Sequence, residues 1–400
     1  MTSRKEAWRV AVCGAVALAV AMGIGRFAFA PLLPMMLHDG VLDLTAGGWL
    51  ATVNYIGYFF GALLCMMLRG NPVYFIRLGL VGTVVLTFGM GMSQTLWVLV
   101  LLRAAAGIAS ALVLVFSSAW CLQRLTQLGA PGLAGVTFTG AGFGIVITGL
   151  PISAMVACGW SAHQGWQLFG IVALVLSALI WTTFSGHART PGLQANVPNK
   201  LPPTQASVRH QREVTGLVVG YGIAGFGYII TATFLPVIAH QALPGSHWPD
   251  FFWPLFGFFM GTGALLAMRI PAHIDNRMVL SVFYVLQAAG ILSSVIWPTV
   301  AGLIACSLLV GFPFSLIVLF AMREARRLRG DHASRLMGLQ TAMYGLGQIV
   351  GPPLATRLVH QTGSFTASLL VAVVALVLGA ALFALMTYQT RREAHLCLLQ

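Results

Sequence analysis

Acidic side chains are scarce in this chain: only nine of its 400 residues are Asp or Glu, against 22 Lys and Arg. Charged residues of both signs make up 8% of the sequence and hydrophobic residues 58%, and the mean hydropathy is +0.87. A soluble core cannot bury so much apolar surface. The composition therefore excludes an ordinary soluble domain and is typical of a helical membrane protein with many spans.

Other absences exclude further classes of protein. The six cysteines are scattered without a CxxC spacing, which argues against a metal site and against a disulfide framework. The sequence has no Gly-x-x-x-x-Gly-Lys run, so it does not support ATP-driven pumping. We expect no Asp, Glu or His inside the membrane helices, and a membrane-embedded enzyme would need such residues. We therefore expect neither enzymatic activity nor a cofactor.

Apolar runs long enough to cross a hydrocarbon layer about 30 Å thick recur along the chain. We count twelve and predict that each is a transmembrane helix. The first is too long for the core of a signal peptide and lacks a small-residue cleavage site, so we expect it to be retained. The predicted helices span residues 10–37, 47–68, 73–92, 95–121, 133–158, 165–184, 215–239, 250–268, 278–297, 299–321, 336–358 and 365–387.

The basic residues predict the orientation of these helices. If the N-terminus is cytoplasmic, 19 of the 22 Lys and Arg residues fall on the cytoplasmic side, Arg357 falls outside, and Arg26 and Arg103 lie within helices. The positive-inside rule then places both termini in the cytoplasm of a bacterial inner membrane. The net charge of +13 is thus a topology signal, and we expect contact with the lipid bilayer, no nucleic-acid partner, and a monomer.

The two halves of the chain resemble each other at a constant displacement of 202 positions. Clusters of matching residues recur in the first, second and fifth helices of each half, for example Gly23 and Gly25 against Gly225 and Gly227. Such a repeat indicates a six-helix unit used twice, as in many transporters. We predict a six-helix bundle over residues 1–184, a flexible cytoplasmic linker over 185–214, and a second bundle over 215–400.

Several of these features together resemble one family of transporters. Two sets of six helices, a central linker, Arg103 followed four residues later by Gly107, and Gly- and Pro-rich fifth and eleventh helices are similar to the major facilitator superfamily. The stretches 23–34, 48–58 and 103–120 resemble, more narrowly, its YbfB/YjiJ-type bacterial branch. The resemblance implies an all-α integral membrane fold of twelve helices in two six-helix repeats, and a transporter of no particular substrate.

One motif departs from the superfamily. The pattern between helices two and three is Gly-x-x-x-Asp-Arg, but the run from Gly61 places Cys65 and Met66 at the two charged positions. The corresponding residues of the second half are Ala267 and Met268. The charged cytoplasmic latch that the family motif implies is therefore not expected here.

Two charged residues lie well inside the predicted membrane zone, Arg26 and Arg103, where an arginine costs roughly 2.5–3.5 kcal/mol. Both fall near the same depth, and the resemblance implies that the first and fourth helices line a central cavity. A permanently charged, forked guanidinium suits a carboxylate or a similar oxyanion, so we expect both to bind the substrate. Alternatively, each binds carbonyls that Pro31 and Pro34 leave free, and serves helix packing only.

Polar residues on other helices form a second candidate wall of the site. Interhelical hydrogen bonding explains such residues at least as often as a ligand does. With the two arginines, the candidate substrate-binding residues are Asn54, Tyr58, Tyr228, Gln340, Tyr344 and Gln348.

The sequence thus predicts a secondary active transporter of a small anionic solute that works by alternating access. Because no membrane-embedded carboxylate is expected to carry a proton, and because an anion leaving a negative-inside cell moves down the potential, we expect export or exchange. The alternative is a membrane sensor or lipid-handling scaffold on the same fold, which would not need a pair of cations at mid-depth.

Overall fold

The computed structural model describes residues 2–68, 70–184, 208–267, 274–329 and 333–398. Within these ranges the secondary structure is helical, with turns between the helices. The N-terminal half contains α1 (Thr2–Leu18), the π-helix η1 (Ala19–Phe27), α2 (Phe29–His38), α3 (Leu44–Met67), α4 (Pro72–Met90), α5 (Leu96–Gln127), the 3-10 turn η2 (Pro131–Leu133), α6 (Ala134–Gly149), α7 (Pro151–Ala157) and α8 (Ala162–Ile180). The C-terminal half contains α9 (Val208–Ala242), α10 (Pro249–Ala267), α11 (Asn276–Ile296), α12 (Val300–Arg329), α13 (Ala333–Thr362) and α14 (Thr366–Leu398).

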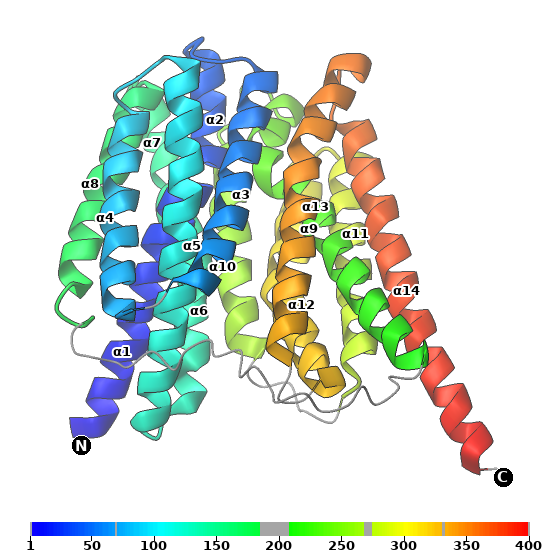
Figure 1. Ribbon diagram of the computed structural model, residues 1–400. Coiled ribbons are helices and arrows are strands. Elements are labelled where there is room, and N and C mark those ends of the chain that lie inside the picture. Colours follow the sequence, from blue (N-terminus) through cyan, green and yellow to red (C-terminus); the bar gives the residue numbers. More distant parts are fainter. Residues whose placement is uncertain (1, 69, 185–207, 268–273, 330–332, 399–400) are drawn as a thin grey trace.

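These elements make two sets of six long helical segments. The segments α1, η1 and α2 follow one another with at most one residue between them, and so do α6 and α7, which gives six segments in the first half and six in the second. Figure 1 shows the halves side by side, with both chain termini at one end of the bundle. We call this the terminal end and the opposite one the distal end. The predicted twelve-helix fold is confirmed.

Local sequence signals explain where several helices begin. The side chain of Asp43 accepts a hydrogen bond from the Ala46 N–H at 2.7 Å and so caps α3. Asn71 caps α4 ahead of Pro72, which suits the first turn of a helix because it needs no N–H there. Asp275 caps α11 in the same way.

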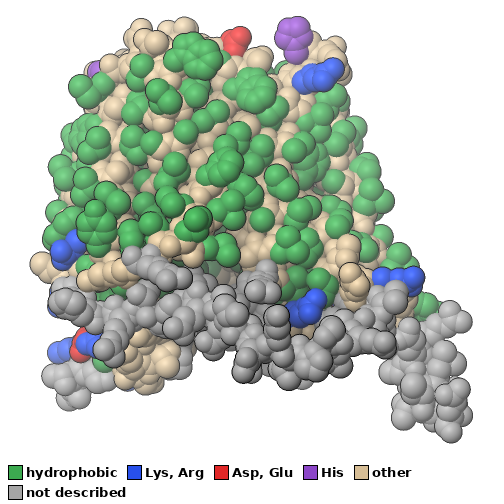
Figure 2. Space-filling model, in the orientation of Figure 1, with side chains coloured by type: hydrophobic (Ala, Val, Ile, Leu, Met, Phe, Trp, Pro, Cys, Tyr) green, Lys and Arg blue, Asp and Glu red, His purple; other side chains and the backbone are tan. Residues whose placement is uncertain are grey.

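The surface of the bundle matches a membrane environment. Hydrophobic side chains cover the middle of the face shown in Figure 2, and Lys and Arg gather toward the terminal end. Ten helices of the described ranges are long and apolar enough to cross a membrane. The segments α10 and α13 are not among them; α13 contains two prolines and several polar residues, which lower its mean hydropathy.

The predicted linker is described only in part. Residues 185–207 lie outside the described residues, as does Met268 of the family motif. Residues 208–214 already belong to α9, so the second half begins earlier than the apolar run suggested. The cause is that the first turns of this helix are polar, and hydropathy alone does not detect them.

The two halves touch closely at and beyond mid-height, toward the distal end. The Tyr55 and Thr233 hydroxyls lie 2.9 Å apart, and Ser153 Oγ donates to Asp250 Oδ2 at 2.9 Å. A Cβ at Gly142 would lie only 2.5 Å from the Gly257 carbonyl oxygen, so the backbones of α6 and α10 are in direct contact. We infer that the distal side of the bundle is closed in this structure.

Candidate functional site

The first long segment changes its helical register where Arg26 lies. Residues Ala19–Phe27 form π-helical turns, in which an N–H bonds to the carbonyl five residues earlier. Pro31 has no N–H, so a π-helical bond to the Arg26 carbonyl would lack its donor. Arg103 of α5 supplies one: its Nη2 lies 3.3 Å from the Arg26 oxygen, and its Nη1 lies 3.4 Å from the Gly25 oxygen.

The remaining contacts of Arg103 are also structural. Its Nε lies 3.5 Å from the Leu50 carbonyl oxygen, and its guanidinium carbon lies 4.7 Å from the centre of the Phe29 ring. The side chain is 1% exposed. This geometry matches the alternative that the sequence left open, in which the arginine binds backbone carbonyls. A contact between Arg103 and substrate stays a prediction.

The side chain of Arg26 connects the two halves. Its Nη2 donates to Gln348 Oε1 of α13 at 2.7 Å, and Gln348 Nε2 donates in turn to the Tyr228 hydroxyl of α9. On the side of the N-terminal half, the guanidinium carbon lies 4.2 Å from the ring centre of Tyr58 and 4.9 Å from that of Tyr55. Such contacts with aromatic faces stabilise a desolvated cation, and Arg26 is only 3% exposed.

One edge of the Arg26 guanidinium is half occupied. The Nε and Nη2 groups point to the same side of the fork, where a carboxylate can accept from both. Gln348 occupies Nη2, whereas Nε is buried and has no hydrogen-bond partner among the described residues. An unpaired buried donor is costly, so this edge is suited to a second acceptor atom.

Within the part of the chain that the structure describes, carboxylates do not neutralise the charge of this centre. Among the described residues, no Asp or Glu forms an ion pair with Arg26 or Arg103. The arginines lie close together, since one donates to the backbone of the other. Two like charges in a buried place raise the local positive potential, and this favours an anionic ligand.

Aromatic rings of α9 and α13 continue the site toward the terminal end. The rings of Tyr221 and Tyr344 stack with their centres 4.7 Å apart, and the rings of Tyr344 and Tyr228 with theirs 5.6 Å apart. The interplanar angles are 29° and 21°, so the three rings are nearly parallel. Together with Tyr55 and Tyr58, whose rings lie against Arg26, they form a group of five tyrosines at this centre.

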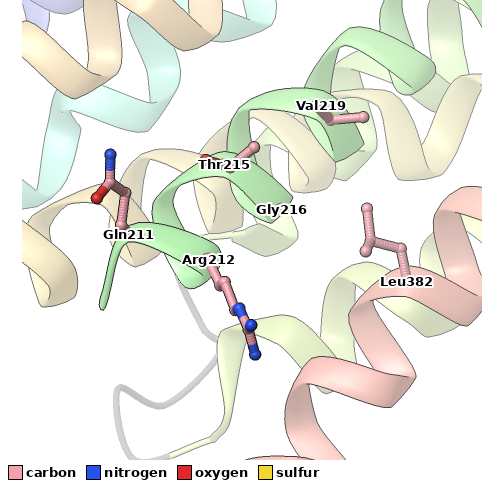
Figure 3. Close-up of a pocket in the computed structure, with 6 residues that line it drawn as sticks. All are labelled: Gln211, Arg212, Thr215, Gly216, Val219 and Leu382. Atoms are coloured by element: carbon pink, nitrogen blue, oxygen red, sulfur yellow. The ribbon is translucent and has the colours of Figure 1, made fainter. Parts of the chain in front are cut away.

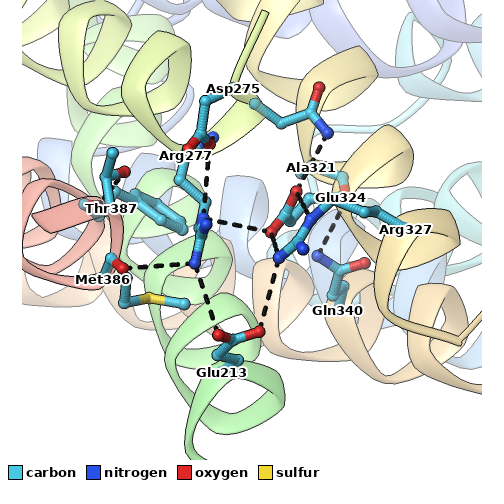
Figure 4. A network of polar contacts seen from close by, with 11 residues as sticks. Glu213, Asp275, Arg277, Ala321, Glu324, Arg327, Gln340, Met386 and Thr387 are labelled. Atoms are coloured by element: carbon cyan, nitrogen blue, oxygen red, sulfur yellow. Dashed lines mark hydrogen bonds and ion pairs between the residues drawn. The ribbon is translucent and has the colours of Figure 1, made fainter. Parts of the chain in front are cut away.

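The structure places two candidate residues elsewhere. Asn54 donates through Nδ2 to the Arg103 carbonyl oxygen at 2.9 Å and thereby ties α3 to α5. Gln340 donates through Nε2 to the Ala321 carbonyl oxygen at 3.4 Å, beside a charged cluster at the terminal end (Figure 4). Neither has a hydrogen bond to Arg26, so their contact with substrate stays a prediction.

That charged cluster joins three helices of the C-terminal half. Arg277, 3% exposed, lies between carboxylates of Asp275 (3.4 Å), Glu324 (3.5 Å) and Glu213 (3.7 Å). Arg327 pairs with Glu324 at 2.7 Å. Glu324 is fully buried. The cluster fixes α9, α11 and α12 to one another and is distinct from the site around Arg26 (Figure 4).

A groove of about 510 Å³ opens between α9 and α14 (Figure 3). It belongs to the part of α9 nearest the terminal end and does not include Arg26. Its lining consists of Gln211, Arg212, Thr215, Gly216, Val219 and Leu382.

Five of the candidate residues come together, Arg26, Tyr58, Tyr228, Tyr344 and Gln348. The list of candidates did not include Tyr55 and Tyr221, which complete the aromatic wall. The spacing contained the signal, because Tyr55 is three residues from Tyr58 and Tyr221 is seven from Tyr228, and these separations return to the same helix face.

Two six-helix repeats that meet around this buried polar centre define the class of protein: the fold is that of a major facilitator superfamily transporter. More particularly, the chain belongs to the family described as "Uncharacterised MFS-type transporter YbfB", whose profile matches residues 18–384. The protein is therefore a multi-pass membrane protein of a transporter family with a small-molecule substrate, and the expected family resemblance is confirmed.

A solved structure supports the same fold. The crystal structure of a single-residue mutant of the nucleoside transporter NupG superposes with a TM-score of 0.75 at 14% sequence identity, over 95% of this chain and 99% of that one. A comparison with curated proteins finds no match.

Proposed function

We propose that the protein is a secondary active transporter that moves a small anionic solute across the membrane by alternating access. The observation that carries this proposal is the buried Arg26 guanidinium, which has no carboxylate partner among the described residues and a half-occupied edge. An anionic substrate would supply both the missing charge and the missing acceptor. We assign Tyr58, Tyr228, Tyr344 and Gln348 to the same binding site.

The bond between the halves suggests how binding and movement are coupled. Arg26 belongs to the first half and Gln348 to the second. A substrate carboxylate that takes the Nη2 and Nε donors of Arg26 displaces Gln348 and thereby changes the contact between the halves. The closed distal contacts can then separate while the terminal side closes, which is the rocking movement expected of this architecture.

We assign Arg103 and Asn54 a supporting role. Arg103 holds the backbone of the π-helical turns in place, and Asn54 holds the Arg103 carbonyl. Both therefore act on the substrate through the position of Arg26.

We further propose a bacterial inner-membrane location with both termini in the cytoplasm, function as a monomer, and export or exchange of the anion. Moving one charge through the membrane potential is worth about 2.3 kcal/mol per 100 mV, so a negative-inside potential drives an anion outward. The acids among the described residues lie at helix ends, and the buried Glu324 is already paired with Arg277 and Arg327. This distribution favours potential-driven movement over proton coupling.

Reconstituted protein tests the proposal. Thermal shift with acetate, benzoate, phosphate and sulfate identifies a stabilising anion, because a ligand of the native state raises the melting temperature. Flux of that anion into proteoliposomes is then measured with an imposed potential and, separately, with an imposed pH gradient. Flux that follows the pH gradient and ignores the potential would contradict export or exchange.

Variants of Arg26 test whether its positive charge binds the anion. Arg26→Gln should remove anion binding in folded protein, whereas Arg26→Lys should keep part of it with altered selectivity, since lysine keeps the charge without the fork. Arg357→Gln is the matched control, because this exposed arginine of α13 lies outside the site. Unchanged binding in folded Arg26→Gln protein would assign Arg26 to helix packing.

A further inference from the structure

The tyrosine rings of this centre differ in how accessible they are. Tyr221 and Tyr228 are 4% and 1% exposed and lie within the packed interior. Tyr58 and Tyr344 are half-buried, although Tyr58 covers the Arg26 guanidinium at 4.2 Å and Tyr344 stacks against both buried tyrosines. One partly exposed ring from each half therefore lies at this centre: Tyr58 with a face on Arg26, and Tyr344 stacked on two buried rings.

Several of the polar groups around the same point are occupied. The Tyr55 hydroxyl pairs with Thr233, and the Tyr228 hydroxyl accepts from Gln348. The Asn54 amide donates to the backbone of α5. A ligand with many hydroxyl groups would lose its water here, and each hydroxyl left without a partner would carry a cost.

The free edge of the Arg26 guanidinium determines which charged group of a ligand binds there. Its Nε and Nη2 groups present two parallel donors, and a carboxylate presents two acceptors at a matching separation. A single hydroxyl or carbonyl oxygen would leave one donor unpaired, as Gln348 does now. The centre therefore combines a carboxylate-binding fork with flat aromatic surfaces beside it.

Resting on the anion transport proposed above, we infer that the substrate is a planar aromatic carboxylate. Its carboxylate replaces Gln348 on the Nε and Nη2 edge of Arg26, and its ring packs against Tyr58 of α3 and Tyr344 of α13. Offset-stacked and edge-to-face ring pairs are more favourable than the area they bury alone would predict, and a flat ring needs no hydrogen-bond partners. A ligand in this position touches both halves, as alternating access requires.

Matched pairs of carboxylates test the ring without changing the charge. Purified full-length protein is titrated with benzoate against cyclohexanecarboxylate, phenylacetate against cyclohexylacetate, and 3-phenylpropionate against 3-cyclohexylpropionate, with uridine and glucose as polyhydroxylated probes. We expect the aromatic member of the best-binding pair to bind about tenfold more tightly than its saturated partner, and the polyhydroxylated probes to bind more weakly than either. Equal or tighter binding of the saturated member overturns the inference, as does the absence of binding by every pair.

Variants of Tyr58 and Tyr344 test whether these two rings cause the preference for the aromatic ligand. In Tyr344→Leu and Tyr58→Leu, the two members of the pair should bind with nearly equal affinity, whereas Tyr344→Phe should keep most of the preference because it keeps the ring. Tyr74→Leu is the matched control, since Tyr74 is 62% exposed on α4. A preference that survives both leucine variants in protein that elutes as a folded species overturns the assignment of these rings, and the wild-type pairs decide the question if a variant does not fold.

The outcomes separate this inference from the proposed function. If saturated and aromatic carboxylates bind equally and both depend on Arg26, the inference of an aromatic substrate fails and the proposal of an anion transporter stands. If no carboxylate, phosphate or sulfate binds and Arg26→Gln has no effect, both the aromatic substrate and the anion transporter are contradicted.

Discussion

Arg26 and Tyr228 lie 202 residues apart, at equivalent positions of the two repeats, and both form a hydrogen bond to Gln348. The repeat thus brings two chemically different groups, a guanidinium and a phenol, to one point between the halves. Gln348 accepts from the first and donates to the second, which an amide can do and a carboxylate cannot. The pseudo-symmetric scaffold therefore builds one asymmetric centre, with its charge on the side of the N-terminal half.

Replacing Arg103 should destabilise the protein even without substrate. In Arg103→Ala, the carbonyl oxygens of Gly25, Arg26 and Leu50 lose the donors that Arg103 supplies and a cavity opens beside Phe29, so we expect a loss of roughly 2–4 kcal/mol. Unfolding of the ligand-free protein in detergent measures this loss. Ligand-free Arg103→Ala protein as stable as wild type would contradict the supporting role and favour a direct contact with substrate.

A single methyl group at Gly142 should hold the halves apart. Its Cβ would lie 2.5 Å from both the Gly257 oxygen and the Gly261 nitrogen, and overpacking of this kind typically costs about 1–3 kcal/mol. We expect Gly142→Ala to slow transport and, in a cysteine-free background, to speed the labelling of a cysteine placed at Ser153.

The matched control for this change is Gly338→Ala. Gly338 also faces the other half, but the nearest atom to its Cβ would be the Met66 Cε at 4.0 Å. Equal labelling rates in the two variants would show that contact between α6 and α10 does not keep the distal side closed.

Removal of Arg277 should unbalance the charged cluster of the C-terminal half. Glu324 is fully buried, and in Arg277→Ala only the more exposed Arg327 would compensate it, so we expect a loss of about 3 kcal/mol in the free energy of unfolding. Adding Glu324→Gln should restore part of it. Arg326→Ala serves as control, since this neighbouring arginine is exposed. Equal stability of Arg277→Ala and Arg326→Ala protein would show that the cluster contributes nothing.

The proposed orientation predicts the location of each end of the bundle. Reporter fusions after Gly186 and after Gln400 should both report cytoplasm, because reversal would place 19 of the 22 basic residues outside. A reporter inserted at Gly245, in the distal turn between α9 and α10, should report the opposite side. A periplasmic signal from either of the first two fusions would contradict this orientation.

The sequence by itself determined the class of protein, the number of long helices and the presence of a buried cation. Hydropathy depends only on local composition, and a charge such as Arg26 inside an apolar run is visible without any contact. The repeat was equally visible, because both halves kept glycines in the same register. Helix ends were less predictable: the polar first turns of α9 carry no hydropathy signal.

Only the tertiary structure decided which polar groups face Arg26. The packing of a helix sets the direction of each of its side chains. Helices α3 and α5 approach so closely that a Cβ on Gly107 would lie 2.2 Å from the backbone carbonyl oxygen of Asn54, and the Asn54 side-chain amide points to the backbone of α5. The role of Arg103 depends in the same way on tertiary contact, because it donates to the Arg26 carbonyl oxygen at the end of the π-helical turns. Residues far apart in the sequence meet at these places, so local pattern could name the candidates but could not choose among them.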